Sequence, residues 1–279
     1  MGRSSGRAWP FAVGVGQVAS GHHVDDPQYA ESSRALGEGN LFHRKHWEWV
    51  FIHATAERLG LLKTGRSALG FGVGREPLVS AFAAAGLHVT ATDQPSTTAG
   101  AWADTGQHAQ RARELLRPNI CDEAVFDANV SFRPVDMTDP PDDLGTHDLV
   151  WSSCCFEHLG SPEAGFAFVE RSMRFVKPGG VALHTTEFDL ARVKPLKQQG
   201  SIAAGDYVCY YRRREIADLA ARLRRHGFEV ELDLRVSNDH PMERRIDREP
   251  YSHDPHLRVA MAGRIITSVG LCIRRPHHT

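Results

Sequence analysis

The sequence predicts an α/β fold in which a doubly wound, mostly parallel sheet is covered by helices on both faces. Short apolar segments alternate with longer segments of helical periodicity, and this alternation is typical of a parallel sheet. A glycine-rich turn, Gly70–Gly74, separates the first strand of the series from its helix, and Asp93 ends the next strand. Such a turn indicates a ligand site at the carboxyl ends of the strands.

Length and composition limit the function classes. The chain has 279 residues, which suits one large domain. Lys and Arg total 33 and Asp and Glu total 34, and this balance argues against a protein that binds nucleic acid by neutralising phosphates. No segment approaches the ~20 apolar residues of a membrane helix, so we expect no membrane span. Five cysteines without paired spacing indicate a reducing, cytoplasmic setting.

The N-terminal part precedes the strand and helix series. Residues 1–38 are rich in Gly, Ser and His without sustained periodicity, and we expect a flexible arm there. Residues 39–279 are expected to form a single domain. It begins with a helical extension, because apolar residues between 47 and 61 form a helical stripe that ends near Gly60.

Seven segments predict strands, because each is short, rich in apolar or β-branched residues and bounded by turn residues. In chain order they are 67–71, 87–92, 130–135, 147–152, 181–186, 228–234 and 264–273. Between them, apolar residues recur at intervals of three and four, which predicts helices over 77–85, 108–116, 162–176 and 214–226. Ser161 and Pro162 give the third of these helices a capped start, and Lys177–Gly180 is expected to end it.

The glycine turn is the strongest chemical signal in the sequence. Glycines at 70, 72 and 74 allow a sharp turn and a close approach of a ligand to the backbone. An acidic residue at the position of Asp93 can accept hydrogen bonds from ribose hydroxyls. A dinucleotide-binding fingerprint is one alternative, but it requires glycine where Arg75 stands. A tight connection in an unrelated α/β protein is the other.

Several motifs in one order over residues 66–187 together resemble the class I S-adenosylmethionine-dependent methyltransferases. In chain order they are Leu69–Gly74, Asp93, Val135–Met137, His147–Ser153 with Phe156–Leu159, and Lys177–Gly180. The resemblance implies a Rossmann-like, seven-stranded sheet in the order 3-2-1-4-5-7-6, with the seventh strand antiparallel. It also implies S-adenosylmethionine as the cofactor.

The resemblance implies roles for individual residues in cofactor binding. Gly70, Gly72 and Gly74 would face the methionine and ribose moieties, and Asp93 would hold the ribose.

The remaining cofactor contacts would come from later strands. Asp136 would accept a hydrogen bond from the adenine amino group, with Met137 donating through its backbone, unless Asp136 is only a solvated loop acid. Ser153 would border the methionine moiety. Many family members carry an acid where this chain has Leu69–Gly70, so contact with the cofactor's amino group would come from elsewhere, with the helix around residues 44–49 as the candidate.

The candidate catalytic residues follow the fourth and fifth strands. His158 is placed where an acceptor would meet the methyl group and is a candidate base, with packing or cofactor orientation as the alternative. Glu157 and Glu187 are further candidates. Glu187 and Asp189, together with Asp239 and His240, offer oxygen-rich ligands for Mg²⁺, although solvated loop acids are the alternative.

The sequence therefore predicts an S-adenosylmethionine-dependent methyltransferase, with O-methylation of a saccharide or other small hydroxyl acceptor as the favoured reaction. Residues 247–271 loosely resemble methyltransferases of bacterial polysaccharide assembly, and the long segments 188–210 and 236–262 are expected to shape the acceptor site. The alternatives are N- or C-methylation of a natural-product scaffold and a non-catalytic nucleotide-binding module. A nucleic-acid acceptor is not expected, and a homodimer is left open.

Overall fold

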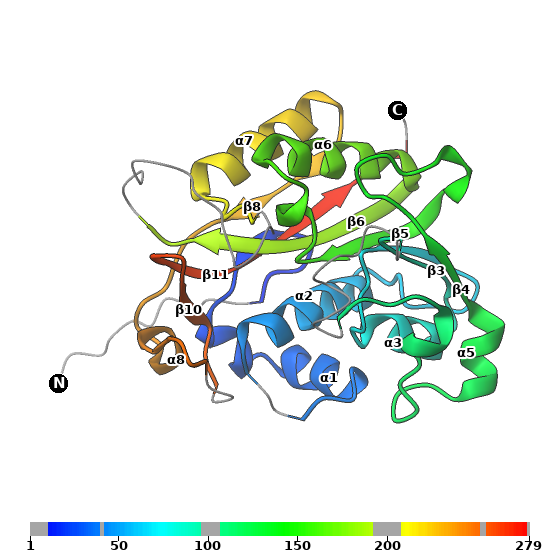
Figure 1. Cartoon of the computed structure of the whole chain (residues 1–279), viewed down its shortest axis with the longest axis horizontal. Helices are drawn as coiled ribbons and strands as arrows, with labels where there is room; N and C mark the ends of the chain where they lie inside the picture. The colour runs from blue at the N-terminus through cyan, green and yellow to red at the C-terminus, as the bar shows by residue number, and fades with distance from the viewer. Residues whose placement is uncertain (1–10, 40–41, 96–106, 192–207, 252–254, 278–279) are drawn as a thin grey trace.

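The computed structural model describes residues 11–39, 42–95, 107–191, 208–251 and 255–277, which form a central sheet between two layers of helices (Figure 1). The five central strands are parallel. In spatial order they are β4 (Val130–Pro134), β3 (His88–Asp93), β2 (Ser67–Phe71), β5 (His147–Ser153) and β6 (Val176–Asp189). β11 (Arg264–Arg274) runs antiparallel to β6, and β7 (Glu229–Val230) pairs antiparallel with β11. The prediction of a doubly wound, mostly parallel sheet is confirmed.

Four further short strands extend this sheet. β1 (Gly16–Val18) pairs with β11 and β8 (Leu232–Asp233) pairs with β1, while β10 (Arg258–Met261) pairs with β11 and β9 (Ile246–Asp247). The described sheet thus has eleven strands, where the sequence predicted seven. The expected sixth strand, 228–234, is divided between β7 and β8.

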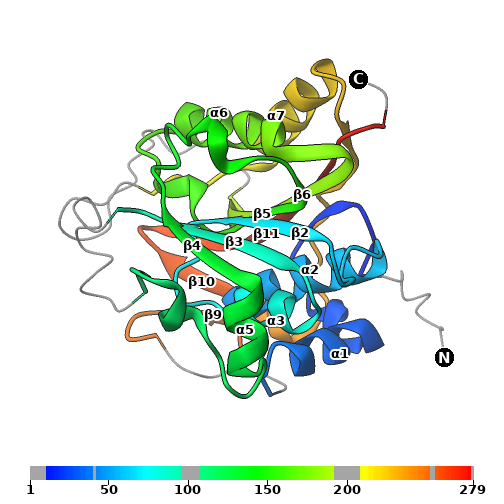
Figure 2. The same cartoon turned by 90° about the vertical axis from the view of Figure 1, so that its right-hand side faces the viewer.

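Helices cover both faces of the sheet (Figures 1 and 2). On one face lie α1 (Pro27–Ala35), α2 (Arg44–Arg58), α3 (Leu78–Ala84) and α5 (Glu123–Asn129). On the other lie α6 (Pro162–Ser172) and α7 (Arg213–Arg225), and the short α8 (Pro241–Arg244) lies at one side. Single 3-10 turns are η1 (Gly21–Asp25), η2 (Ala112–Leu115), η3 (Asp142–Leu144), η4 (Phe156–His158) and η5 (Met173–Phe175). None of the helices in the described ranges combines the length and apolar surface that crossing a bilayer requires.

The segment that we expected to be a flexible arm is part of the fold from residue 11 onward. Tyr29 is fully buried, and α1 packs against α2. The polar side chains of this region are satisfied internally: Trp47 Nε1 donates to His23 Nδ1 at 2.9 Å, and His46 lies within hydrogen-bond distance of both Tyr29 and Ser33. A composition rich in Ser and His therefore did not indicate exposure. Residues 1–10 lie outside the described residues.

Two further elements differ from expectation. The helix predicted over 108–116 is only the turn η2, and the helix that precedes β4 is α5. Residue Arg111 has an extended backbone, which prevents a helix from beginning earlier. The segment 177–180 does not end a helix but lies within β6, because the helix has already ended at Ser172.

The beginnings of β2, β5 and β6 are joined through the carboxylate of Asp148. It accepts hydrogen bonds from Lys177 Nζ at 2.8 Å and from the backbone N–H of Ser67 at 2.9 Å, and it pairs with Arg66. Burial alone would raise the pKa of Asp148, but these donors outweigh it and hold the pKa well below its usual range.

We expect Asp148→Asn to lower the free energy of unfolding by about 1–3 kcal/mol at pH 7. Since the folded-state pKa is depressed, this stabilisation is complete above the unfolded pKa of about 4 and is lost as the pH falls through the folded value. Urea unfolding from pH 3 to 8 measures the difference, with the exposed Asp142→Asn as control. An equal difference at pH 3 and pH 7 would contradict the ionic account.

Candidate active site

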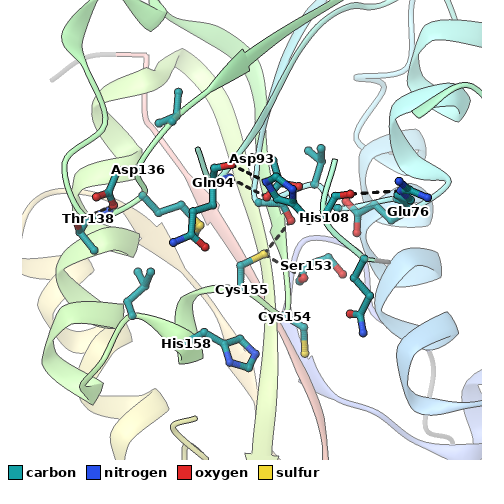
Figure 3. Close-up of a pocket in the computed structure, with 18 of the residues that line it drawn as sticks. Glu76, Asp93, Gln94, His108, Asp136, Thr138, Ser153, Cys154, Cys155 and His158 are labelled. Atoms are coloured by element: carbon teal, nitrogen blue, oxygen red, sulfur yellow. Dashed lines mark hydrogen bonds between the residues drawn. The ribbon is translucent and has the colours of Figure 1, made fainter. Parts of the chain in front are cut away.

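A cavity of about 820 Å³ lies at the carboxyl ends of the central strands (Figure 3). Its walls come from the turn after β2, the ends of β3 and β5, the segment after β4 and the start of α2. Six of the residues expected at a cofactor site line it: Gly72, Gly74, Asp93, Asp136, Met137 and Ser153. The topology thus brings together residues that are far apart in the chain, at the place where α/β sheets bind ligands.

The glycines of the turn differ in what they do. Gly72 and Gly74 have φ values of +57° and +51°, which L side chains rarely adopt. A Cβ on Gly72 would lie 2.9 Å from Cys155 Sγ, and one on Gly74 would lie 2.8 Å from the carbonyl oxygen of Gln107. Gly70, by contrast, does not line the cavity: its Cβ would overlap the indole of Trp151 at 2.3 Å. Close packing is therefore a sufficient reason for glycine at position 70, and its expected place facing the ligand stays a prediction.

The carboxylate of Asp93 is fixed at the end of β3 by backbone donors. The N–H groups of Gln94 and Ala109 donate to its two oxygens at 2.8 and 2.9 Å. Burial raises the pKa of Asp93, and the backbone hydrogen bonds oppose that shift. His108, whose Nε2 lies 2.6 Å from the carbonyl oxygen of Gln94, completes this wall. Gln94 and His108 were not found from the sequence.

Asp136 and Met137 form the wall that follows β4. Both the backbone N–H and the hydroxyl of Thr138 donate to Oδ1 of Asp136, at 2.8 and 2.7 Å. These two bonds occupy one oxygen and hold the carboxylate in place. Met137 is buried, and its sulfur lies close to Gly72. A turn built this way presents one polar and one apolar group to the cavity.

Glu76 is a cavity residue that sequence reasoning missed. It is only 7% exposed, and Trp151 Nε1 donates to its Oε1 at 3.0 Å. Burial raises its pKa to about 8. The sequence contains one signal for it: the turn lacks an acid at Leu69–Gly70 but carries one immediately after Gly74 and Arg75.

Helix α2 contributes Lys45 and Trp49 to the cavity. Lys45 Nζ lies 3.4 Å from Glu48 Oε2, so the cation is held from the protein side. We expected this helix to contact the amino group of a cofactor. Of these two residues Lys45 is a cation, which attracts a carboxylate and repels an ammonium group, so α2 suits the carboxylate of a cofactor better than its amino group.

The three expected catalytic residues lie at one end of the cavity but at different depths. His158 lines the cavity beside Cys154 (Figure 3). Glu157 is fully buried and Glu187 is 6% exposed, and neither lines the cavity. Burial and the negative charge of Glu187 raise the pKa of Glu157 to about 7. Arg44 Nη2 donates to Glu187 Oε1 at 2.9 Å.

The expected Mg²⁺ ligands are not assembled in the described part of the chain. Asp189 is held by Arg212 at 3.1 Å and Arg264 at 2.6 Å, and its charge is thereby compensated. The Asp239 side chain is 70% exposed and pairs with His22, and His240 caps α8. Among the described residues, a close group of metal-ligating side chains is instead formed by Cys154, Glu157 and Glu187.

Comparison with known proteins agrees with this geometry. A family model described as a methyltransferase domain matches residues 43–232, more than half of the chain. No curated protein sequence matches the chain.

Solved structures with similar coordinates include three methyltransferases of low sequence identity. An O-methyltransferase family protein from Burkholderia thailandensis is 14% identical, with a TM-score of 0.45. The match covers 90% of this chain but only 63% of that protein. A putative sarcosine dimethylglycine methyltransferase from Galdieria sulphuraria is 15% identical, with coverages of 82% and 84% and a TM-score of 0.49. Magnesium protoporphyrin IX methyltransferase from Synechocystis PCC 6803, with bound S-adenosylhomocysteine, is 14% identical, with coverages of 80% and 79% and a TM-score of 0.46.

The family match covers β2–β6, and the carboxyl ends of β2–β5 build the cavity. The chain belongs to the methyltransferase domain family and is an S-adenosylmethionine-dependent methyltransferase.

Proposed function

We propose that the enzyme holds S-adenosylmethionine in the central cavity and transfers its methyl group to an oxygen of a small, polar acceptor. Gly72 and Gly74 let the methionine and ribose moieties approach the backbone. Asp93, fixed by its backbone donors, accepts hydrogen bonds from the ribose hydroxyls. Asp136 and Met137 form the wall that holds the adenine, and the carboxylate of Asp136 accepts a hydrogen bond from the adenine amino group.

The amino-acid end of the cofactor is held by an acid and a base that face the cavity. Glu76 binds the α-ammonium group, because a buried carboxylate that has no ion pair with any described residue has strong affinity for a cation. Lys45 binds the α-carboxylate from α2. Glu76 thereby replaces the acid that Leu69–Gly70 lacks.

Methyl transfer from a sulfonium is an in-line displacement, so the protein acts mainly by aligning nucleophile, methyl group and sulfur in a site that excludes water. An acceptor hydroxyl must also lose its proton. His158 lines the cavity and takes this proton in our proposal. The placement of His158 in the cavity wall, next to the buried Glu157 in η4, is the observation that carries the choice of oxygen as the acceptor atom.

The favoured acceptor is a saccharide hydroxyl. The loose resemblance of residues 247–271 to methyltransferases of bacterial polysaccharide assembly supports this choice. Methylation of nitrogen or carbon in a natural-product scaffold is the alternative.

Calorimetry with S-adenosylhomocysteine, followed by turnover assays on acceptor panels, tests this function. We expect binding of the nucleotide and turnover with a hydroxylated acceptor, whereas its deoxy analogue is inert. Turnover on an amine or carbon acceptor with the deoxy analogue still active would contradict O-methylation. Nucleotide binding without turnover on any acceptor would favour a binding module.

The role of Glu76 predicts a proton release on cofactor binding. At pH 7 a carboxyl group with a pKa of about 8 is mostly protonated, and it must lose this proton to pair with the ammonium group. We expect Glu76→Gln to weaken S-adenosylhomocysteine binding by about 10- to 100-fold, corresponding to a charged hydrogen bond of about 1.5–3 kcal/mol. Calorimetry in two buffers of different ionisation enthalpy counts the protons, with the exposed Glu163→Gln as control. The same proton release in wild type and Glu76→Gln would contradict the assignment.

A further inference from the structure

Three potential metal ligands meet directly behind the cavity wall. Sγ of Cys154, a carboxylate oxygen of Glu157 and a carboxylate oxygen of Glu187 all lie within 4.8 Å of one another. Cys154 follows β5, Glu157 lies in η4, and Glu187 lies in β6. All three side chains are buried, with exposures of 8%, 0% and 6%. They therefore form a compact group shielded from solvent rather than a cluster of surface acids.

Glu157 lacks the partners that a buried carboxylate requires. Neither of its oxygens is placed to accept a hydrogen bond, and within the described ranges no Lys, Arg or His nitrogen lies within 4.0 Å of them. Burying an ionised carboxylate without a partner is strongly unfavourable. Glu157 therefore keeps its proton unless a cation joins it, and no described side chain supplies that cation to its carboxylate oxygens.

Lys45 pairs with Glu48, whereas Arg44 also contacts two members of the group, Glu187 and, at 3.5 Å, Sγ of Cys154. Arg44 lies 3.0 Å from Glu48 and 2.9 Å from Glu187 Oε1, and Lys45 lies 3.4 Å from Glu48. Glu187 Oε2 is left without a hydrogen-bond partner. Arg44 thus orients Glu187 from one side while its second oxygen stays available, which is how outer-shell partners hold a ligating carboxylate.

We propose that Cys154, Glu157 and Glu187 bind one thiophilic divalent cation of the zinc type. Zinc–sulfur and zinc–oxygen bonds are about 2.3 and 2.0–2.2 Å long, so two ligand atoms of one ion lie at most about 4.5 Å apart. Small side-chain adjustments bring the three ligands into this range. A thiolate ligand selects zinc-type ions over Mg²⁺, which prefers oxygen ligands alone.

The backbone at Cys154 and the balance of protons fit this assignment. Cys154 has a φ of +54°, a costly conformation for a residue other than glycine. Its thiol donates a hydrogen bond to Glu48 at 3.3 Å. Binding of the cation forms the metal–sulfur bond and releases the thiol proton to solvent, along with any proton held by Glu157.

The consequence for the reaction rests on the proposed function. Three protein ligands leave a fourth coordination position, as catalytic zinc sites do. Cys154 also lines the cavity, so an acceptor oxygen can reach the ion from there. Coordination lowers the pKa of the acceptor hydroxyl, and His158 takes its proton.

Cobalt titration of the full-length, reduced and chelator-treated protein tests the site without any acceptor. We expect one equivalent of Co²⁺ to produce a thiolate-to-cobalt charge-transfer band, and Zn²⁺ to abolish it by displacement. Cys154→Ser should remove this band. Glu157→Gln and Glu187→Gln should weaken Co²⁺ binding by about tenfold or more. Cys155→Ser is the matched control, because this neighbouring cysteine lines the cavity but is outside the group, and it should keep the band.

Several results would overturn the site. The first is the absence of a charge-transfer band from the wild type at saturating Co²⁺. The second is a band that survives Cys154→Ser, and the third is an undiminished Co²⁺ affinity in both glutamine variants. Far-ultraviolet circular dichroism verifies that each variant is folded. If Cys154→Ser does not fold, the Co²⁺ affinities of the two glutamine variants test the site. Calorimetry with S-adenosylhomocysteine on the same samples separates the two proposals: nucleotide binding without the cobalt band refutes the metal site alone, whereas the band without nucleotide binding refutes the proposed cofactor site alone.

Discussion

Alanine at position 158 is expected to lower kcat by about 10²- to 10⁴-fold, the usual contribution of a positioned general base. The Kd for S-adenosylhomocysteine should stay within about twofold of wild type, because the nucleotide contacts come from the glycine turn, Asp93 and the segment after β4. Single-turnover formation of S-adenosylhomocysteine, at saturating cofactor and acceptor, measures the chemical step directly.

The matched control for this substitution is His88→Ala. His88 is an exposed histidine at the start of β3, at the opposite end of that strand from Asp93 and the cavity. It should leave both kcat and Kd unchanged. If His158→Ala instead weakens nucleotide binding in proportion to the loss of kcat, the imidazole packs against the cofactor and is not a base. An unchanged kcat would remove His158 from the reaction altogether.

The part of the site that could be predicted from the sequence depends on short-range geometry. Gly72 and Gly74 follow a buried strand, and Asp93 ends the next one, so parallel pairing of β2 with β3 places them together without knowledge of any other segment. Strand and helix alternation was sufficient to predict the sheet for the same reason. Periodicity and turn chemistry act within about ten residues, and they were sufficient for the central strands and for α2, α3, α6 and α7, but not for α1 and α5.

Glu76 and Lys45 could not be found in this way, because their positions depend on contacts distant in sequence. Glu76 is held by Trp151 from β5, and Lys45 is placed by the docking of α2 on the sheet. At Gly70 the motif position indicated a ligand, and the structure adds a packing reason that the motif did not contain, because the indole of Trp151 occupies the space beside it. A sequence motif identifies the position of the glycine, but only the tertiary packing shows which neighbouring group leaves no room for a side chain there.

The N-terminal region was misjudged for a different physical reason. Its buried polar groups satisfy one another, as Trp47 with His23 and His53 with Ser32 do, at 2.9 and 3.0 Å. Hydropathy reads such residues as surface because it cannot register a hydrogen bond. Hydropathy also carries no information on the pairing of β5 with β6. It therefore could not predict that Cys154, Glu157 and Glu187 lie close together.

Gly72→Val is expected to weaken S-adenosylhomocysteine binding by about 100-fold or more, equivalent to about 2.7 kcal/mol. Valine is a β-branched residue that strongly disfavours the φ of +57° found at this position. Its Cβ would also lie 2.9 Å from Cys155 Sγ and 3.2 Å from Met137 Sδ, so the added methyl groups must displace the cavity wall or enter the cavity. Calorimetric titration with the nucleotide measures the change.

Backbone strain alone could destabilise the protein and imitate lost binding, so Gly145→Val provides the matched control. Gly145 has a φ of +75°, but nothing lies within 4 Å of its added Cβ, and it does not line the cavity. Both variants should therefore lose stability through strain, by about 1–3 kcal/mol. Only Gly72→Val should lose nucleotide affinity when both are assayed well below their melting temperatures. Equal nucleotide affinity in the two variants would mean that the cofactor does not approach the turn after β2, and the arrangement proposed for Asp93 and Glu76 would fail with it.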